Sequence, residues 1–170
     1  MHSSWTTTPA YVADRNHDLV AVNELGRQFL PEYLLAGHNI LESIVDGAGA
    51  ETESRRRALW NQTITELTAA LRFHGAAADP RLQLLVASLS CRSRVFRTAW
   101  ASEEALPLRR GIVPVDIPPF GYIDFHWETV QVRGGAHFLT SFFGGPDSTA
   151  QAAVEFLAAK LRLEERLLEG

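Results

Sequence analysis

Residues 123–128 read Ile123-Asp124-Phe125-His126-Trp127-Glu128, and after Arg133-Gly134-Gly135 comes a second apolar-rich run at residues 137–143. In the first run, large apolar side chains alternate with charged or polar ones, which is the period of a half-buried antiparallel strand. Two such runs on either side of a glycine turn predict a β-hairpin with one face toward a core.

Three further strands are predicted before this hairpin. Residues 10–13 and 18–22 flank a turn-like tetrapeptide at 14–17. Residues 112–117 look extended, although Pro114 suits only an edge strand or a bulge. The two early strands and the three late ones together predict a five-stranded antiparallel sheet.

Helices are predicted between the second and third strands. Asn23 is predicted to cap a short helix that follows the second strand. The longest helix covers about residues 52–74 and has one apolar face. Asp79-Pro80 and Ser93 mark the starts of two more helices. Residues 37–49 look mixed, with room for one or two helical turns.

These elements predict an α+β domain of the PAS type. It has a five-stranded antiparallel sheet with helices inserted between strands 2 and 3, and a C-terminal helix. This plan commonly houses a small ligand between the sheet and the helices. Residues 9–146 are assigned to the ligand-binding domain, and residues 147–170 to a helix that packs on it or on a partner.

Composition and charge exclude several classes of protein. With 170 residues, 46% of them hydrophobic and 21% charged, the chain has one domain's length and is too apolar to be disordered. The single cysteine, Cys91, excludes an intramolecular disulfide framework and a cysteine-rich zinc site. The net charge of −4 argues against a chain that binds the nucleic-acid backbone through its overall charge.

The sequence also predicts where the protein works. No apolar run approaches the roughly 18 residues that a membrane span needs. Met1-His2-Ser3-Ser4-Trp5 lacks the basic-then-apolar plan of a signal peptide. We therefore expect a cytoplasmic protein with no membrane contact. Lys160 is the only lysine beside 15 arginines, a bias typical of GC-rich bacterial genomes.

A series of short segments carries a further signal through its order and spacing. The segments are Thr8-Pro9-Ala10-Tyr11-Val12, Leu19-Val20-Ala21-Val22-Asn23, Asn39-Ile40-Leu41, Trp60, Leu71-Arg72, Asp79-Pro80-Arg81-Leu82, Ser93-Arg94-Val95-Phe96-Arg97-Thr98-Ala99-Trp100, Pro118 with Gly121, and Gly145-Pro146. From about Pro9 to Leu161, the chain thereby resembles the ligand-binding domain of MmyB-like transcription regulators. Each segment is weak alone, but together they are fairly specific.

The resemblance implies a fatty-acid-binding sensor that controls transcription, in a family found mainly in actinobacteria. Members typically carry a helix-turn-helix before this domain. Only eight residues precede Pro9, so we expect DNA contact only through a helix-turn-helix domain absent from this chain, which is either excised or stand-alone. The sequence departs from the family pattern, in ways that bear on the ligand more than on the fold, at Glu42, Val45, Ile117 and Ser93-Arg94-Val95-Phe96.

An acyl ligand needs an apolar tunnel. Its carboxylate needs a hydrogen-bond donor, ideally the guanidinium of an arginine. Arg72 and Arg97 lie beside apolar helical faces and match family segments, although an arginine there also suits a surface ion pair. Asn39 is a third candidate anchor, or a helix cap. The predicted wall residues, each of which also suits an ordinary core, are Trp60, Phe96, Trp100, Phe125, Trp127, Phe138 and Phe142.

The other residue clusters do not indicate catalysis or metal binding. No nucleophile elbow or phosphate loop is present, so the sequence predicts no enzyme, and no cofactor other than a bound fatty acid. Cys91 is predicted to act as a small buried hydrophobic residue. Arg55-Arg56-Arg57 is predicted to form a solvent-exposed helix face. A solvated sheet face explains, without a metal, the polar residues Asp124, His126, Glu128 and His137.

The last helix has apolar side chains on more than one side. One set is predicted to dock on the domain: Val154, Leu157 and Leu161. A second apolar face often marks a partner, so we predict a homodimer through the remaining Phe156, Leu163 and Leu167.

Two alternatives to a ligand sensor remain. One is a PAS-like dimerisation module without ligand, which a dense core with no cavity of a few hundred cubic ångströms would support. The other is a small enzyme acting on a lipid-like substrate, which titratable groups converging inside the cavity would support.

Overall fold

The computed structural model describes residues 7–146 and 148–170. Met1–Trp5, from which the absence of a signal peptide was predicted, and Asp147, at the predicted boundary of the last helix, lie outside the described residues. The predicted five-stranded antiparallel sheet is confirmed, with the strand order β2-β1-β5-β4-β3. The strands are β1 (Ala10–Asp14), β2 (Leu19–Val22), β3 (Arg110–Ile117), β4 (Gly121–Gln131) and β5 (His137–Phe143).

The β4–β5 hairpin lies in the sheet as predicted. It places Trp127 opposite Phe142, and the pairing of β5 with β1 places Tyr11 opposite Thr140. The central strand β5 thereby joins the N-terminal strands to the C-terminal ones. Pro114 lies in β3, an edge strand, where its missing N–H removes no hydrogen bond from an interior ladder.

The predicted helix starts are confirmed by their caps. The side chains of Asn23, Asp79 and Ser93 accept hydrogen bonds from backbone N–H groups of the first turns that follow them. The helices are α2 (Glu24–Phe29), α3 (Ile40–Ala50), α4 (Ser54–His74), α5 (Pro80–Arg92), α6 (Arg94–Ala101) and α7 (Thr149–Glu169).

Helix α3 is longer than the one or two turns predicted. Asn39 caps it by accepting a hydrogen bond from the N–H of Glu42 at 3.1 Å. Glycines disfavour a helix, but Gly47 lets α3 approach Tyr33, since a Cβ at that position would lie 2.6 Å from Cε1 of the tyrosine. Tertiary packing overrides local propensity here.

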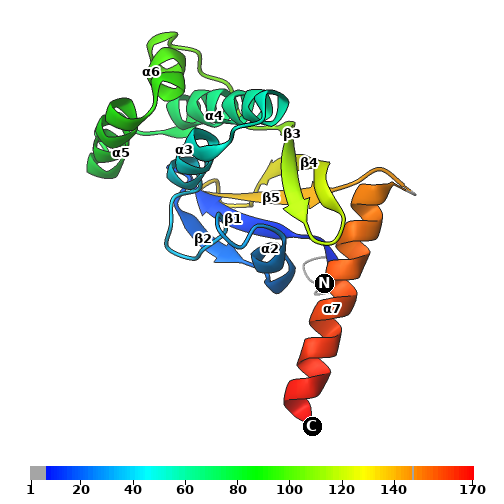
Figure 1. The fold of residues 1–170 in the computed structure, drawn as a ribbon. Coiled ribbons are helices and arrows are strands. Elements are labelled where there is room, and N and C mark those ends of the chain that lie inside the picture. Colours follow the sequence, from blue (N-terminus) through cyan, green and yellow to red (C-terminus); the bar gives the residue numbers. More distant parts are fainter. Residues whose placement is uncertain (1–6, 147) are drawn as a thin grey trace.

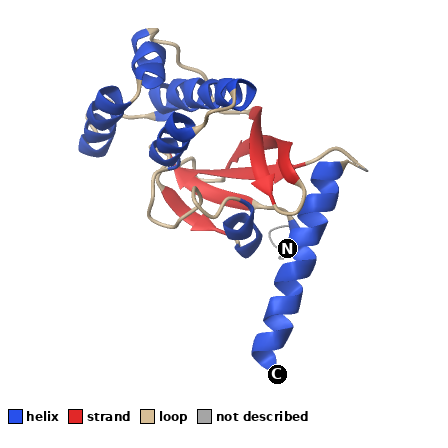
Figure 2. Ribbon diagram, in the orientation of Figure 1, coloured by secondary structure: helices blue, strands red, loops and turns tan. Residues whose placement is uncertain are grey.

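Helices α3 to α6 form two layers on one face of the sheet (Figures 1 and 2). Helix α4 contacts α3 and β3 on one side and α6 on the other, while α5 contacts α3 and α6. Helices α3 and α4 therefore cover the sheet, and α5 and α6 pack outside them. The alternation of β4 follows this plan, because Phe125 and Trp127 are buried and Asp124, His126 and Glu128 are exposed.

Helix α7 packs against α2, β4 and β5 through its first half. Ala150, Ala153 and Leu157 are buried there. The rings of Phe156 and Phe120 lie with their centroids 5.7 Å apart. Figure 1 shows the second half of α7 extending past the sheet.

The buried imidazole of His17 makes the fold sensitive to acid. Its Nε2–H donates to the carbonyl oxygen of Leu67 at 2.8 Å, which ties the β1–β2 turn to α4. Burial lowers the pKa of His17, while this hydrogen bond and the carboxylates of Asp14 and Asp18 oppose the shift. As pH falls, the unfolded chain therefore binds the proton first. The stabilisation that the neutral imidazole of His17 provides is complete above the ordinary histidine pKa of about 6.5. It is lost as pH falls toward the lower pKa of His17 in the folded protein.

We expect the free energy of unfolding to fall more steeply from about pH 7 to pH 5 in the wild type than in His17→Gln. Glutamine does not titrate, so the variant lacks this source of pH dependence. Urea denaturation at each pH measures the slopes, with His137→Gln, at an exposed position, as the matched control. Equal slopes for the wild type and His17→Gln would contradict the prediction.

Candidate ligand-binding site

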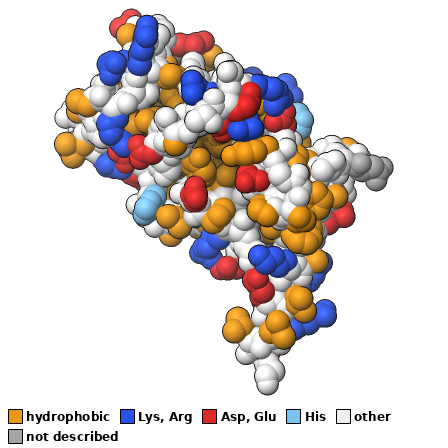
Figure 3. Space-filling view, in the orientation of Figure 1, with side chains coloured by type: hydrophobic (Ala, Val, Ile, Leu, Met, Phe, Trp, Pro, Cys, Tyr) orange, Lys and Arg blue, Asp and Glu red, His pale blue; other side chains and the backbone are white. Residues whose placement is uncertain are grey.

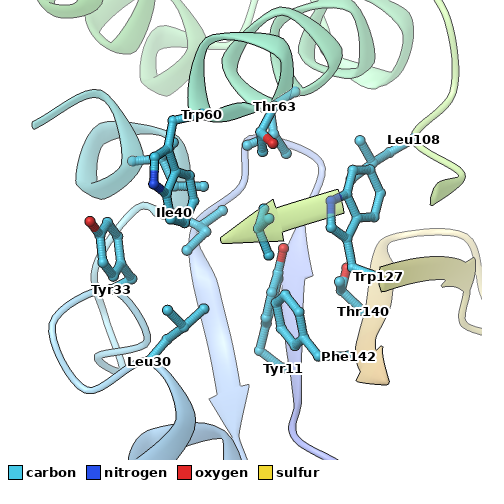
Figure 4. Close-up of a pocket in the computed structure, with 13 residues that line it drawn as sticks. Tyr11, Leu30, Tyr33, Ile40, Trp60, Thr63, Leu108, Trp127, Thr140 and Phe142 are labelled. Atoms are coloured by element: carbon cyan, nitrogen blue, oxygen red, sulfur yellow. The ribbon is translucent and has the colours of Figure 1, made fainter. Parts of the chain in front are cut away.

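A cavity lies between the inner face of the sheet and the helices α3 and α4 (Figure 4). The strands β1, β3, β4 and β5 line one side of it, and α3, α4 and two loops line the other. Its lining residues are mostly apolar and comprise Tyr11, Leu30, Tyr33, Ile40, Ile44, Trp60, Thr63, Leu67, Leu108, Val113, Trp127, Thr140 and Phe142.

The periods of helix and strand explain which side chains point into this cavity. Trp60, Thr63 and Leu67 follow one another at spacings of three and four, so they share one face of α4. On the sheet, the opposed pairs Tyr11–Thr140 and Trp127–Phe142 present their side chains to the same inner face.

The cavity is narrow. Its empty volume is about 390 Å³ when the part open to solvent is included, but the centre of a water molecule could occupy only about 20 Å³ of it. Trp60 contributes to this closure by stacking on Tyr33, with ring centroids 5.4 Å apart and planes inclined by 13°. A larger ligand therefore has to displace lining side chains.

A few polar groups lie among the apolar ones. Burial raises the pKa of Tyr11 to about 12, against the effect of its hydrogen bond with Thr140, so its hydroxyl is neutral at physiological pH. The hydroxyls of Thr140 and Thr129 are 2.6 Å apart, and that of Thr63 donates to the carbonyl oxygen of Leu59 at 3.1 Å. The indole N–H of Trp127 is buried and has no hydrogen-bond partner among the described residues.

Gly111 in β3 makes room for the indole of Trp127. A Cβ at position 111 would lie 2.7 Å from Nε1 and 2.6 Å from Cε2 of Trp127. Real Cβ atoms essentially never approach other heavy atoms so closely, so a side chain at position 111 must push the indole or the strand aside.

We therefore expect Gly111→Ala to lower the free energy of unfolding by about 1–3 kcal/mol, as overpacking of a core usually does. Urea denaturation measures the change. Gly49→Ala is the control, because nothing lies within 4 Å of a Cβ at that helical position. A Gly111→Ala variant as stable as the wild type would show that the indole moves without cost.

Three of the predicted wall aromatics line the cavity: Trp60, Trp127 and Phe142. Phe125 lies in the core beside it, against the ring of Phe29. Phe138 lines a smaller adjoining pocket and contacts His74, with ring centroids 4.5 Å apart.

The aromatics of α6 lie outside the cavity because α6 packs on the far side of α4. Phe96 and Trp100 stack on each other there, at 5.8 Å between ring centroids. Arg72 reaches toward them from α4. Its Nη2 donates to the carbonyl oxygen of Trp100 at 2.6 Å, and its guanidinium lies 4.0 Å from the centroid of that ring.

The other two predicted anchors also have structural partners. Arg97 donates from Nη1 to the carbonyl oxygen of Ser90 at 2.6 Å. Asn39, besides capping α3, donates from Nδ2 to the carbonyl oxygen of Asn16 and to the carboxylate of Asp18. Neither residue lines the cavity.

Several lining residues were not singled out from the sequence as site residues. Thr63 and Leu67 share a helical face with Trp60, so the period of α4 could have placed them. Leu30, Tyr33 and Leu108 lie in connecting segments, where no period exists to show which way a side chain points.

The polar residues of the hairpin lie on the exposed side of the sheet. Asp124 forms an ion pair with Arg55, and the ring of His126 stacks on that of Phe143 at 5.9 Å. Within residues 7–146 and 148–170, no three histidine, cysteine, aspartate or glutamate side chains converge as metal ligands would. Cys91 is exposed, which corrects the expectation of a buried thiol, because it lies on the outer side of α5.

A family model described as MmyB-like transcription regulator ligand binding domain matches residues 2–157. The chain belongs to this family. The resemblance predicted from its short segments is thereby confirmed, and the domain is a ligand-binding domain of a transcription regulator. A search of curated proteins finds no match to the chain. No helix among the described residues of this MmyB-like domain is long and apolar enough to cross a membrane.

Proposed function

We propose that this MmyB-like domain senses a fatty acid or a related apolar small molecule in the cytoplasm of a bacterium, and that it does so without catalysis. The cavity between the sheet and α3–α4 supports this most directly, because its lining is mostly apolar. Burial of each methylene of an acyl chain is worth about 0.8 kcal/mol, so such a site favours long apolar chains.

The narrowness of the cavity suggests how binding changes the domain. An acyl chain between Trp60 and the sheet has to separate side chains that are now in contact, such as the stacked Trp60 and Tyr33. The ligand therefore favours an expanded packing of α3 and α4 over the closed one. In a regulator, a helix-turn-helix domain joined to this one would transmit that change to DNA.

The proposal includes a homodimer formed through α7. Phe156, Leu163 and Leu167 have exposed fractions of 41%, 58% and 74%. Figure 3 shows hydrophobic side chains on the protruding part of the molecule, where α7 extends past the sheet. Such exposed apolar surface is typical of an interaction site. Light scattering at tens of micromolar protein tests the homodimer. A protein that stays monomeric at that concentration would refute this part of the proposal.

Native mass spectrometry of the purified protein is the first test of ligand binding. It should be followed by solvent extraction and mass analysis of whatever is released. We expect a stoichiometric acyl compound, or stabilisation by a fatty-acid panel in thermal-shift assays. An empty protein that ignores the whole panel would refute the proposal.

One observation favours a second function. The small space open to the centre of a water molecule, about 20 Å³, is what a filled core would show. A PAS-like dimerisation module would dimerise in light scattering and bind no member of the fatty-acid panel. A ligand sensor binds at least one of them, so the fatty-acid panel separates the alternatives, whereas light scattering finds a dimer for both.

A further inference from the structure

The cavity adjoins two surface grooves that share its lining residues. The Arg109 groove, lined among others by Glu66, Glu104, Leu108, Arg109, Arg110 and Trp127, shares Leu108 and Trp127 with the cavity. The Glu51 groove, lined among others by Leu30, Tyr33, Glu51, Arg56, Trp60 and Asp116, shares Leu30, Tyr33 and Trp60 with it. A long ligand in the cavity therefore has an exit at either end.

The charge at the Glu51 groove disfavours an anionic head group. Its one arginine, Arg56, is already paired with Glu51, at 3.0 Å between Nε and Oε2. Glu32 and Asp116 add two more carboxylates to the lining. Figure 3 shows acidic side chains beside a hydrophobic hollow between the helical layers and the sheet. A carboxylate here would meet like charges.

The Arg109 groove differs in that its arginines are not paired with carboxylates of the described residues. Arg109 and Arg110 are exposed, and neither has a carboxylate within 4.0 Å in the part of the chain that the structure describes, so neither forms an ion pair there. Glu66 and Glu104 also line this groove. Burial raises the pKa of Glu66, and its hydrogen bond with Gln62 opposes the shift. Arg110 lies opposite Glu128 in the β3–β4 ladder, so its side chain leaves the sheet on the exposed face. The unpaired guanidinium of Arg109 is the one suited to a carboxylate or a phosphate at the cavity.

Trp127 lies where this groove meets the cavity and supplies a second donor. The residue is 3% exposed, and its indole N–H has no partner among the described residues. Figure 4 shows the nitrogen on the side of the ring turned toward the middle of the pocket. Buried donors are nearly always hydrogen-bonded, so this N–H points to an acceptor that a ligand supplies.

We propose that the cavity binds an acyl carboxylate in one orientation. Its carboxylate accepts a hydrogen bond from Trp127 and lies beside Arg109, and its tail runs toward Trp60 and Tyr33. This inference rests on the proposed function and adds to it the head-group class, its anchors and the direction of the chain. The sequence-based anchors, Arg72 and Arg97, have no part in it.

Binding of two probes with the same tail tests the orientation. Isothermal titration measures the affinities of dodecanoate and 1-dodecanol for the wild type and for the double variant Arg109→Gln/Arg110→Gln. Both positions are exposed, so the fold should persist. We expect dodecanoate to bind the double variant at least about tenfold more weakly and dodecanol to bind as before. Arg94→Gln/Arg133→Gln, at two exposed arginines elsewhere, is the matched control and should change neither affinity.

A second variant tests the indole N–H. Trp127→Phe keeps an aromatic ring and removes the donor, so the preference for dodecanoate over dodecanol should shrink. If the wild type binds both probes and neither variant alters that preference, the orientation is refuted while the proposed function stands. If the wild type binds neither probe, nor any acid of the panel, the proposed function fails and this inference fails with it.

Discussion

Replacing Phe125 with alanine is expected to lower the free energy of unfolding by about 3–5 kcal/mol. The side chain is fully buried in β4. Its ring meets that of Phe29 edge to face, at 4.7 Å between centroids and 89° between planes, so α2 is held to the sheet at this point. Alanine would leave a void that the surrounding sheet cannot fill without moving Phe29. This loss is comparable with the whole stability of a marginal domain.

Urea denaturation measures the effect, and Phe143→Ala is the control. Phe143 lies on the exposed face of the neighbouring strand, so its replacement should cost less than about 1 kcal/mol. Because Phe125 does not line the cavity, the ligand affinity of the molecules that remain folded should not change. A cost below 1 kcal/mol for Phe125→Ala would mean that the α2–sheet contact contributes little.

The contrast between Phe125 and Trp127 shows how far the sequence predicts the site. Their alternation with polar residues placed both on the buried face of one strand, and the structure confirms that. The period of a strand carries no information about which part of the face lies under α2 and which under α4. Only Trp127 lies under α4, so only it lines the cavity.

The helices show the same limit. Caps at Asp79 and Ser93 and the apolar faces that follow were readable because they are local signals. The apolar face of α6 was also identified, but a period does not reveal whether that face meets a sheet or another helix. Phe96 and Trp100 pack on the α4 side, and so they were expected in a wall that they do not form.

The residues at the ends of the cavity had no pattern to reveal them. Arg109 and Arg110 stand at the junction of a loop with β3, and the sequence does not distinguish them from the other arginines. Their interest comes from three-dimensional facts: the groove that they line, its shared wall with the cavity, and the lack of ion pairs there. Burial, not residue type, likewise singles out the indole N–H of Trp127.

The second large effect is a loss of ligand affinity, expected when Thr63 is replaced. Helix α4 directs the side chain of Thr63 into the cavity. In Thr63→Phe, a ring would occupy the narrow space that an acyl chain needs. Exclusion of about four methylenes, each worth about 0.8 kcal/mol, corresponds to a loss of affinity of about 200-fold. The added volume should lower the free energy of unfolding by about 1–3 kcal/mol. The lost hydrogen bond to Leu59 lies within the helix and adds little.

Titration of the variant with dodecanoate measures the affinity, and urea denaturation shows that it is folded. Thr98→Phe makes the same chemical change at an exposed position of α6, outside the cavity, and should leave the affinity unaltered. If Thr63→Phe binds dodecanoate as tightly as the wild type does, the acyl chain lies elsewhere on the domain. If both variants lose affinity equally, the effect comes from the added phenylalanine in general. A loss confined to Thr63→Phe would place the ligand between α4 and the sheet, because that is where the side chain of Thr63 points.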